Sequence, residues 1–301
     1  MASASRIDLL DPFEVAQLGG LEIVAEGVVE GFLAGLHRSP FRGFSVEFAE
    51  HRPYEAGDEL RYVDWRMLAR SDKLFVKQYE EETNLRSMIV LDASASMNWS
   101  GMERRLTKLA YGKRLTAAIA LVFLRQRDAT GFIGFDEEVR CLVPARARRQ
   151  QWWMLLNAVH NLEAGRGTAA EDALRRVTGL LRRRGLVVFI SDLLFDRDLA
   201  LLAMQYLRHR GHQVLVFHVM DPSELFLEGP PEARFEDLET GDLVSARPRD
   251  LRAAYNETVR RAIDAWRTQC RRSGIAYHHV LTDSPFGYVL RRATARRARL
   301  G

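Results

Sequence analysis

Residues 88–97 read Met-Ile-Val-Leu-Asp-Ala-Ser-Ala-Ser-Met, and this stretch decides the fold of the chain. Its four leading apolar residues form a short run bounded by polar residues, which predicts a strand buried on both faces. We expect the strand to end near Asp92, so that Asp92, Ser94 and Ser96 lie at its carboxyl end, where open α/β sheets bind ligands. One carboxylate and two hydroxyls are hard oxygen ligands, which suit Mg²⁺ or Mn²⁺. A strand followed by a serine-rich turn is the simpler interpretation of this stretch alone.

The rest of the chain predicts further strands that alternate with helices. Strands are expected at residues 130–135, 138–143, 186–190, 213–219 and 276–281, and helices at 100–127, 150–162, 168–184, 197–210 and 250–273. This order predicts an α/β fold, a doubly wound and mostly parallel sheet with helices on both faces, in which 138–143 is an antiparallel edge strand. Ser100 and Glu103 predict a capping box, and Asp196 predicts another helix N-cap.

The chain is expected to form two domains. Residues 1–85 predict a small amino-terminal α+β module, with helices over residues 8–37 and strands near 44–48 and 74–79. Residues 86–301 predict the sheet domain, with a hairpin insertion at 221–248. About forty mixed-charge residues are marginal as an independent domain, so we expect the segment from Phe41 to Glu82 to pack on the sheet domain.

Two further residues extend the set of oxygen ligands. Asp192 follows the buried strand at 186–190, and Thr168 opens the helix predicted at 168–184. Each also has a plainer role, because Thr168 and Glu171 form a capping-box pattern and Asp192 suits a turn. If the strands that end at Asp92 and Asp192 are neighbours, the two carboxylates face each other across the carboxyl edge of the sheet. Mg²⁺ keeps several waters in its octahedral shell, so three hydroxyls and two acids suffice for a site.

Composition narrows the classes of function. The chain has 301 residues, a net charge of +4 and two cysteines, and its amino terminus lacks the apolar core of a signal peptide. We therefore expect a cytoplasmic protein without a membrane span. The clustered basic residues are Arg146, Arg148, Arg149, Arg182, Arg183, Arg184, Arg291, Arg292, Arg296, Arg297 and Arg299. Aromatic residues do not interleave these arginines except Tyr288, which favours solvated surfaces over nucleic-acid binding.

The oxygen ligands, taken in chain order, resemble a known metal site. Asp92-x-Ser94-x-Ser96, Thr168 and Asp192 are similar to the metal ion-dependent adhesion site of von Willebrand factor A domains. The segment before them is similar to the bacterial family known as domain of unknown function 58. The residues that carry this second resemblance are Arg38-Ser-Pro, Gly43-Phe-Ser-Val-Glu47-Phe, Arg52-Pro-Tyr54, Gly57-Asp58, Arg61, Asp64-Trp65 and Ala69-Arg70.

The resemblance implies a function as well as a fold. Similar proteins are partners of MoxR-type AAA+ ATPases, and many carry two amino-terminal membrane helices that this sequence lacks. The first hypothesis is therefore a metal-dependent protein-binding adaptor, not an enzyme. In this hypothesis Mg²⁺, or Mn²⁺, is held by Asp92, Ser94, Ser96, Thr168 and Asp192. It receives a carboxylate from a MoxR-type AAA+ ATPase or from a client protein.

An enzymatic function is the alternative hypothesis. A strand followed by an aspartate and a metal also describes aspartyl-phosphate phosphatases, in which Asp92 would be the nucleophile. Such enzymes carry two aspartates in the pattern Asp-x-Asp. In this sequence Ser94 stands in place of the second aspartate. The chain also lacks the phosphate-binding loop of nucleotide hydrolases and the nucleophile elbow of serine hydrolases. The binding module is thus favoured over a phosphatase, and DNA or RNA binding has only the arginine clusters behind it.

Overall fold

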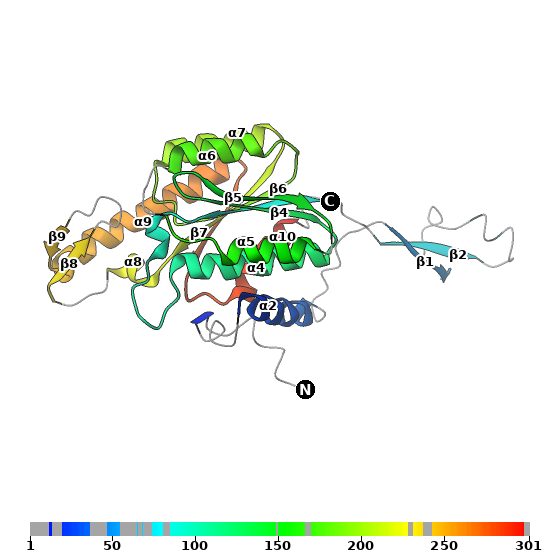
Figure 1. Ribbon diagram of the computed structural model, residues 1–301, viewed down its shortest axis with the longest axis horizontal. Coiled ribbons are helices and arrows are strands. Elements are labelled where there is room, and N and C mark those ends of the chain that lie inside the picture. The colour runs from blue at the N-terminus through cyan, green and yellow to red at the C-terminus, as the bar shows by residue number, and fades with distance from the viewer. Residues whose placement is uncertain are drawn as a thin grey trace.

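A six-stranded sheet lies at the centre of the computed structural model (Figure 1). The model describes residues 12–13, 20–36, 47–54, 65, 68, 74–80, 85–148, 150–165, 170–227, 231–236 and 243–297. The strands are β3 (Arg86–Asp92), β4 (Ala129–Phe135), β5 (Val139–Arg146), β6 (Leu186–Ser191), β7 (Gln213–Met220) and β10 (Ala276–Leu281). Their order is β10-β7-β6-β3-β4-β5, and β5 runs antiparallel to β4 while the other pairs are parallel.

Helices cover both faces of this sheet, as Figure 1 shows. One face packs against α2 (Leu21–Leu36), α4 (Lys108–Arg125), α5 (Gln151–His160) and α10 (Phe286–Arg297). The other face packs against α6 (Ala170–Leu180), α7 (Arg197–His209) and α9 (Pro248–Arg272). Two separate apolar cores result, and the predicted doubly wound, mostly parallel α/β fold is confirmed.

The burial of the strands follows their residue patterns. Every residue of β6 is buried, and so are the last four residues of β3, as expected of central parallel strands. Along β5 buried and exposed residues alternate in the second half, and β5 lies at the edge of the sheet. The predicted antiparallel edge strand is therefore confirmed, although it extends to Arg146.

The start of α4 differs from the prediction. The helix begins at Lys108, and the Thr107 hydroxyl accepts a hydrogen bond from the Ala110 N–H at 3.1 Å. The capping box at Ser100 and Glu103 is wrong, because the Ser100 hydroxyl instead donates to the Met102 carbonyl. Tertiary contacts hold residues 100–105 in turns, since a Cβ at Gly101 would lie 2.2 Å from Ser223 Oγ. The N-cap at Asp196 is confirmed, because its carboxylate accepts from two backbone N–H groups of α7 at 2.9 Å each.

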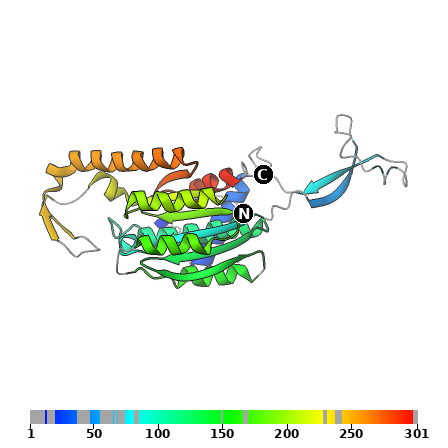
Figure 2. The ribbon, with the colours of Figure 1, turned by 90° about the horizontal axis from the view of Figure 1, so that it is seen from above.

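The amino-terminal part of the chain contributes one helix to the sheet domain and a separate pair of strands. Helix α2 packs against α4 and α10, and it buries Val24, Val28 and Phe32 in the core of the sheet domain. Strands β1 (Glu47–Pro53) and β2 (Phe75–Glu80) form an antiparallel pair that lies apart from the sheet in Figures 1 and 2. The expectation that this segment packs on the sheet domain is wrong for β1 and β2, which use their backbone hydrogen bonds on each other. The domain boundary near residue 85 stays a prediction.

The predicted insertion forms an arm at the carboxyl edge of the sheet. We call "the arm" the short helix α8 (Pro222–Phe226), the antiparallel pair β8 (Ala233–Glu236) and β9 (Leu243–Ala246), and the amino-terminal half of α9. In Figures 1 and 2 the arm extends beyond the sheet, with β8 and β9 at its tip. No helix among the described residues is both long and apolar enough to cross a membrane.

Candidate metal centre

The parallel pairing of β3 and β6 brings two of the predicted ligands to one place. Leu91 pairs with Ile190, so Asp92 and Asp192 follow neighbouring strands at the same edge of the sheet. Both side chains are buried, with exposed fractions of 0% and 2%. The condition on which the metal hypothesis depended, that these two strands are neighbours, is therefore met.

Hydrogen bonds hold the Asp92 carboxylate in a fixed orientation. Its Oδ1 accepts from the Ser94 N–H at 2.9 Å, and its Oδ2 accepts from the Ser191 hydroxyl at 2.6 Å. The Oγ atoms of Ser94 and Ser96 lie 3.2 Å apart, and both residues are buried. A short 3₁₀ helix, Ala95–Asn98, turns the chain so that the two hydroxyls meet. The structure thus brings Asp92, Ser94 and Ser96 together as predicted.

Thr168 lies outside the described residues, in the gap between residues 165 and 170. The described end of that loop does reach the site, because the Gly165 N–H donates to the Ala93 carbonyl at 2.7 Å. The role of Thr168 as the fifth metal ligand stays a prediction. The predicted helix after it is confirmed in kind, although α6 is described from Ala170 and ends at Leu180 rather than near residue 184.

Two buried acids, Asp92 and Asp192, determine the electrostatics of the site. Burial, and next the charge of Asp192, raise the pKa of Asp92 from 3.8 to about 7. Hydrogen bonds from Ser191 and Ser94 act in the opposite direction and do not cancel this effect. A carboxylate that is buried beside another acid is stabilised in its charged form by a nearby cation. A cation next to Asp92 would therefore lower this pKa and favour the charged carboxylate.

Sequence reasoning missed the cation that already sits on the Asp192 side. The Lys108 ammonium group donates to Asp192 Oδ2 at 2.8 Å and to Glu224 Oε1 at 2.5 Å. Burial lowers the pKa of Lys108, but the two carboxylates more than offset this, and the pKa lies above its ordinary value. The local pattern does not reveal this role, because Lys108 is one of many basic residues and its partners are 84 and 116 residues away. Ser191 was also missed, although its place directly before Asp192 was a usable signal.

The donor set fits a hard divalent cation in part. Asp92, Ser94 and Ser96 are oxygen donors of the kind that Mg²⁺ binds, while Asp192 is already paired on one oxygen. Within the described ranges, no three His, Cys, Asp or Glu side chains come together in a way that could bind a metal. An ion at this edge would thus depend on serine hydroxyls and on water, as the predicted site requires.

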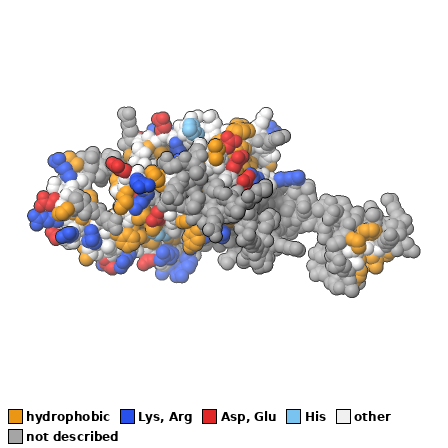
Figure 3. Space-filling view, turned by 90° about the horizontal axis from the view of Figure 1, so that it is seen from below, with side chains coloured by type: hydrophobic (Ala, Val, Ile, Leu, Met, Phe, Trp, Pro, Cys, Tyr) orange, Lys and Arg blue, Asp and Glu red, His pale blue; other side chains and the backbone are white. Residues whose placement is uncertain are grey.

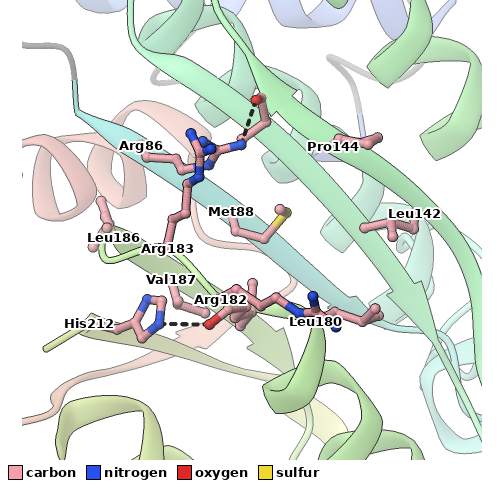
Figure 4. Close-up of a pocket in the computed structure, with 13 residues that line it drawn as sticks. Arg86, Met88, Leu142, Pro144, Leu180, Arg182, Arg183, Leu186, Val187 and His212 are labelled. Carbon is pink, nitrogen blue, oxygen red and sulfur yellow. Dashed lines mark hydrogen bonds between the residues drawn. The ribbon is translucent and has the colours of Figure 1, made fainter. Parts of the chain in front are cut away.

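A pocket of about 220 Å³ lies at the opposite, amino-terminal edge of the sheet (Figure 4). Arg86, Arg182 and Arg183 line it together with apolar side chains such as Met88 and Leu142. Arg86 donates to the Ala145 carbonyl at 3.0 Å, and no acid among the described residues pairs with Arg182 or Arg183. This pocket is basic, and His212 is the one imidazole among its described lining residues, with no carboxylate beside it.

Comparison with known proteins identifies the family. The chain folds into an α/β domain with two buried acids and two buried serines at the carboxyl edge of its sheet. A model of a protein family of unknown function, DUF58, matches residues 50–265. An uncharacterized protein of Mycobacterium tuberculosis is 31% identical over 251 residues, which cover 79% of this chain and 75% of that protein. The chain belongs to the DUF58 family, as the resemblance of its sequence motifs predicted.

Two solved structures align with most of the chain. The conserved hypothetical protein BatB from Bacteroides thetaiotaomicron is 16% identical, with a TM-score of 0.48 over 71% of this chain and 98% of that one. An aerotolerance-related membrane protein from Bacteroides fragilis is 17% identical, with a TM-score of 0.47 over 72% of this chain and 100% of that one.

Proposed function

We propose that this protein is a metal-dependent protein-binding adaptor. Mg²⁺, or Mn²⁺, would be held by Asp92, Ser94 and Ser96, with Asp192 acting through water and Thr168 as the fifth predicted ligand. The observation that carries the proposal is geometric: the buried Asp92 carboxylate accepts from the Ser94 N–H, and the Ser94 and Ser96 hydroxyls meet in the same buried loop. The ion would supply an electrophilic position that a partner's carboxylate can fill.

The charges around the site support binding rather than mere storage of an ion. A divalent ion in direct contact with Asp92 and two neutral hydroxyls would have only one anionic ligand in its own shell, while Lys108 shares its charge between Asp192 and Glu224. A carboxylate from a partner would complete the coordination shell, and the low dielectric constant of an interface would strengthen this bond. The partner that the family resemblance implies is a MoxR-type AAA+ ATPase or one of its client proteins.

A pull-down experiment tests this proposal. A MoxR-type AAA+ ATPase from the same genome would be recovered on the wild-type protein with Mg²⁺, and recovery would fall with chelator or in Ser94→Ala/Ser96→Ala. Ser87→Ala is the matched control, because Ser87 is a buried serine at the other end of β3 that bonds to Thr130. Equal recovery under all conditions would mean that the ATPase docks elsewhere.

A further inference from the structure

Lys108 connects the metal centre to a second part of the molecule. Its side chain is 1% exposed, and its ammonium group lies between Asp192 after β6 and Glu224 in α8. The Trp99 ring covers it as well, with the nitrogen 5.9 Å from the ring centroid. A lysine this deeply buried requires compensating anions, and the two carboxylates provide them. The same cation is therefore shared by a predicted metal ligand and by the first helix of the arm.

Glu224 is well placed to transmit a change to the arm. It forms a capping box at the start of α8, because its Oε2 accepts from the Asp221 N–H at 2.8 Å while Asp221 accepts from the Ser223 N–H. Helix α8 also contacts α9. One end of the Lys108 bridge thus reaches the base of the arm.

Arg105 makes a parallel contact that does not involve the metal ligands. Its guanidinium group donates to Asp221 Oδ1 at 2.7 Å and to Ser223 Oγ at 3.1 Å. This contact joins the start of α8 to the loop before α4 and uses neither Asp192 nor Lys108. A change in the Lys108 bridge would therefore alter how firmly α8 is held and would not detach the arm.

A divalent ion near Asp192 would act directly on this bridge. Lys108 uses Asp192 Oδ2, so the ion or its bound water would compete with the ammonium group for the same carboxylate. The two positive charges would also repel each other at short range in a buried site. Loss of the bond to Asp192 leaves Lys108 with only Glu224, and the bridge between the sheet edge and α8 is broken at one end.

We propose that Lys108 is a positioning residue that competes with the divalent ion for Asp192 and so couples occupation of the metal centre to the packing of α8 and the arm. This inference rests on the proposed function, because it needs a metal at Asp92 and Asp192. Its consequence is that a partner bound at the metal and a partner bound at the arm would sense each other.

The test measures Mg²⁺ affinity by calorimetry and amide hydrogen exchange at residues 223–227 in the full chain. In the wild type, Mg²⁺ should speed exchange in α8. Lys108→Met should bind Mg²⁺ about tenfold more tightly, since one charge-assisted hydrogen bond no longer competes for Asp192. It should also lose the metal-dependent change in exchange. Lys113→Met is the matched control, because Lys113 lies on the same helix and donates to the His160 carbonyl.

The outcomes separate this inference from the proposed function. If the wild type binds no Mg²⁺, the metal centre itself fails, and the inference fails with it. If Mg²⁺ binds but Lys108→Met keeps both the wild-type affinity and the metal-dependent exchange in α8, only the role of Lys108 is overturned. If Lys113→Met gains as much Mg²⁺ affinity as Lys108→Met, the gain comes from the lower net charge of the protein. That result would overturn the proposal that Lys108 competes with Mg²⁺ for Asp192.

A second variant keeps the test decisive if Lys108→Met does not fold. Glu224→Gln removes the α8 end of the bridge and leaves both predicted acidic ligands in place. Exchange at residues 223–227 should then be fast with and without Mg²⁺, so that the metal-dependent difference is lost. A difference as large as that of the wild type would overturn the inference.

Discussion

The two edges of the central sheet carry charge in different ways. At the carboxyl edge Asp92, Asp192 and Lys108 are almost completely buried; Lys108 donates to Asp192 at 2.8 Å, and Asp92 accepts two hydrogen bonds of 2.6 and 2.9 Å from its own neighbours. At the amino edge Arg182 and Arg183 are exposed around a pocket (Figure 4). A buried charge interacts strongly because little water screens it, whereas an exposed charge is largely screened. Burial, and not the number of charges, therefore distinguishes the edge at which we propose the metal centre.

The same distinction bears on the nucleic-acid hypothesis. On the face shown in Figure 3, basic and acidic side chains are interspersed at the end of the molecule that carries β8 and β9. Several arginines there and on α9 pair with acids, as Arg247 does with Glu232 and Arg261 with Glu257. Mixed charge of this kind favours solvated surfaces, and nucleic-acid binding is not part of the proposed function.

The largest expected effect is the loss of stability when the buried cation Lys108 is removed. Lys108→Met should destabilise the protein by about 3–5 kcal/mol, because it leaves the buried Asp192 and the partly buried Glu224 without their cation. Arg183→Met at the amino edge should change the free energy of unfolding by no more than about 0.5 kcal/mol, since this side chain is exposed. Urea unfolding of both variants checks the comparison. Similar losses at the two edges would contradict it.

The next effect concerns the metal itself. At a hundred times its dissociation constant, Mg²⁺ should stabilise the protein by about 2.7 kcal/mol relative to chelator. For a domain of this size that is a rise in Tm of roughly 2–4 °C per kcal/mol. Asp92→Asn should abolish the rise, whereas Asp136→Asn should keep it, because Asp136 is a buried acid after β4 that pairs with Arg140. A wild-type Tm that is the same with Mg²⁺ and with chelator would contradict the metal centre.

A smaller effect concerns pH at the amino edge. Burial lowers the pKa of His212, whose Nε2 lies 2.9 Å from the Leu181 carbonyl oxygen. The unfolded state therefore takes up a proton at higher pH than the folded state does. Stability should be fully present above the ordinary pKa of 6.5 and should fall as pH drops below it.

The variant His212→Gln isolates this contribution. It should show a shallower loss of stability between neutral and mildly acidic pH, as measured by urea unfolding across that range. Mg²⁺ affinity at neutral pH should stay at its wild-type value, because His212 lies at the edge opposite the metal centre. A slope equal to that of the wild type would mean that other groups control the acid response.

The smallest expected effect is the absence of catalysis. Ser94 stands where a phosphatase would have its second acid, so phosphate and carboxyl esters should show no turnover above background with Mg²⁺. Steady-state assays with a panel of such esters check this expectation. Turnover that disappears in Asp92→Asn would favour the phosphatase alternative.

The sequence by itself determined the elements and the first loop of the site. Central strands bury both faces, so β3 and β6 appear as continuous apolar runs, and the polar residues after them must lie at the sheet edge. Asp92, Ser94 and Ser96 are close in the sequence, and one short turn brings their side chains together. Local patterns of this kind need no knowledge of distant contacts.

Only the tertiary structure decided what lies around that loop. Asp92 and Asp192 lie close together only because β3 and β6 are adjacent in the sheet. The bridge from Lys108 to Glu224 joins residues that are 116 positions apart in the sequence. The failed capping box at Ser100 has the same origin, since contacts with α8 override the local preference. A lysine becomes a structural cation only when the fold removes water from it, and the energy of that burial depends on partners that no local window contains.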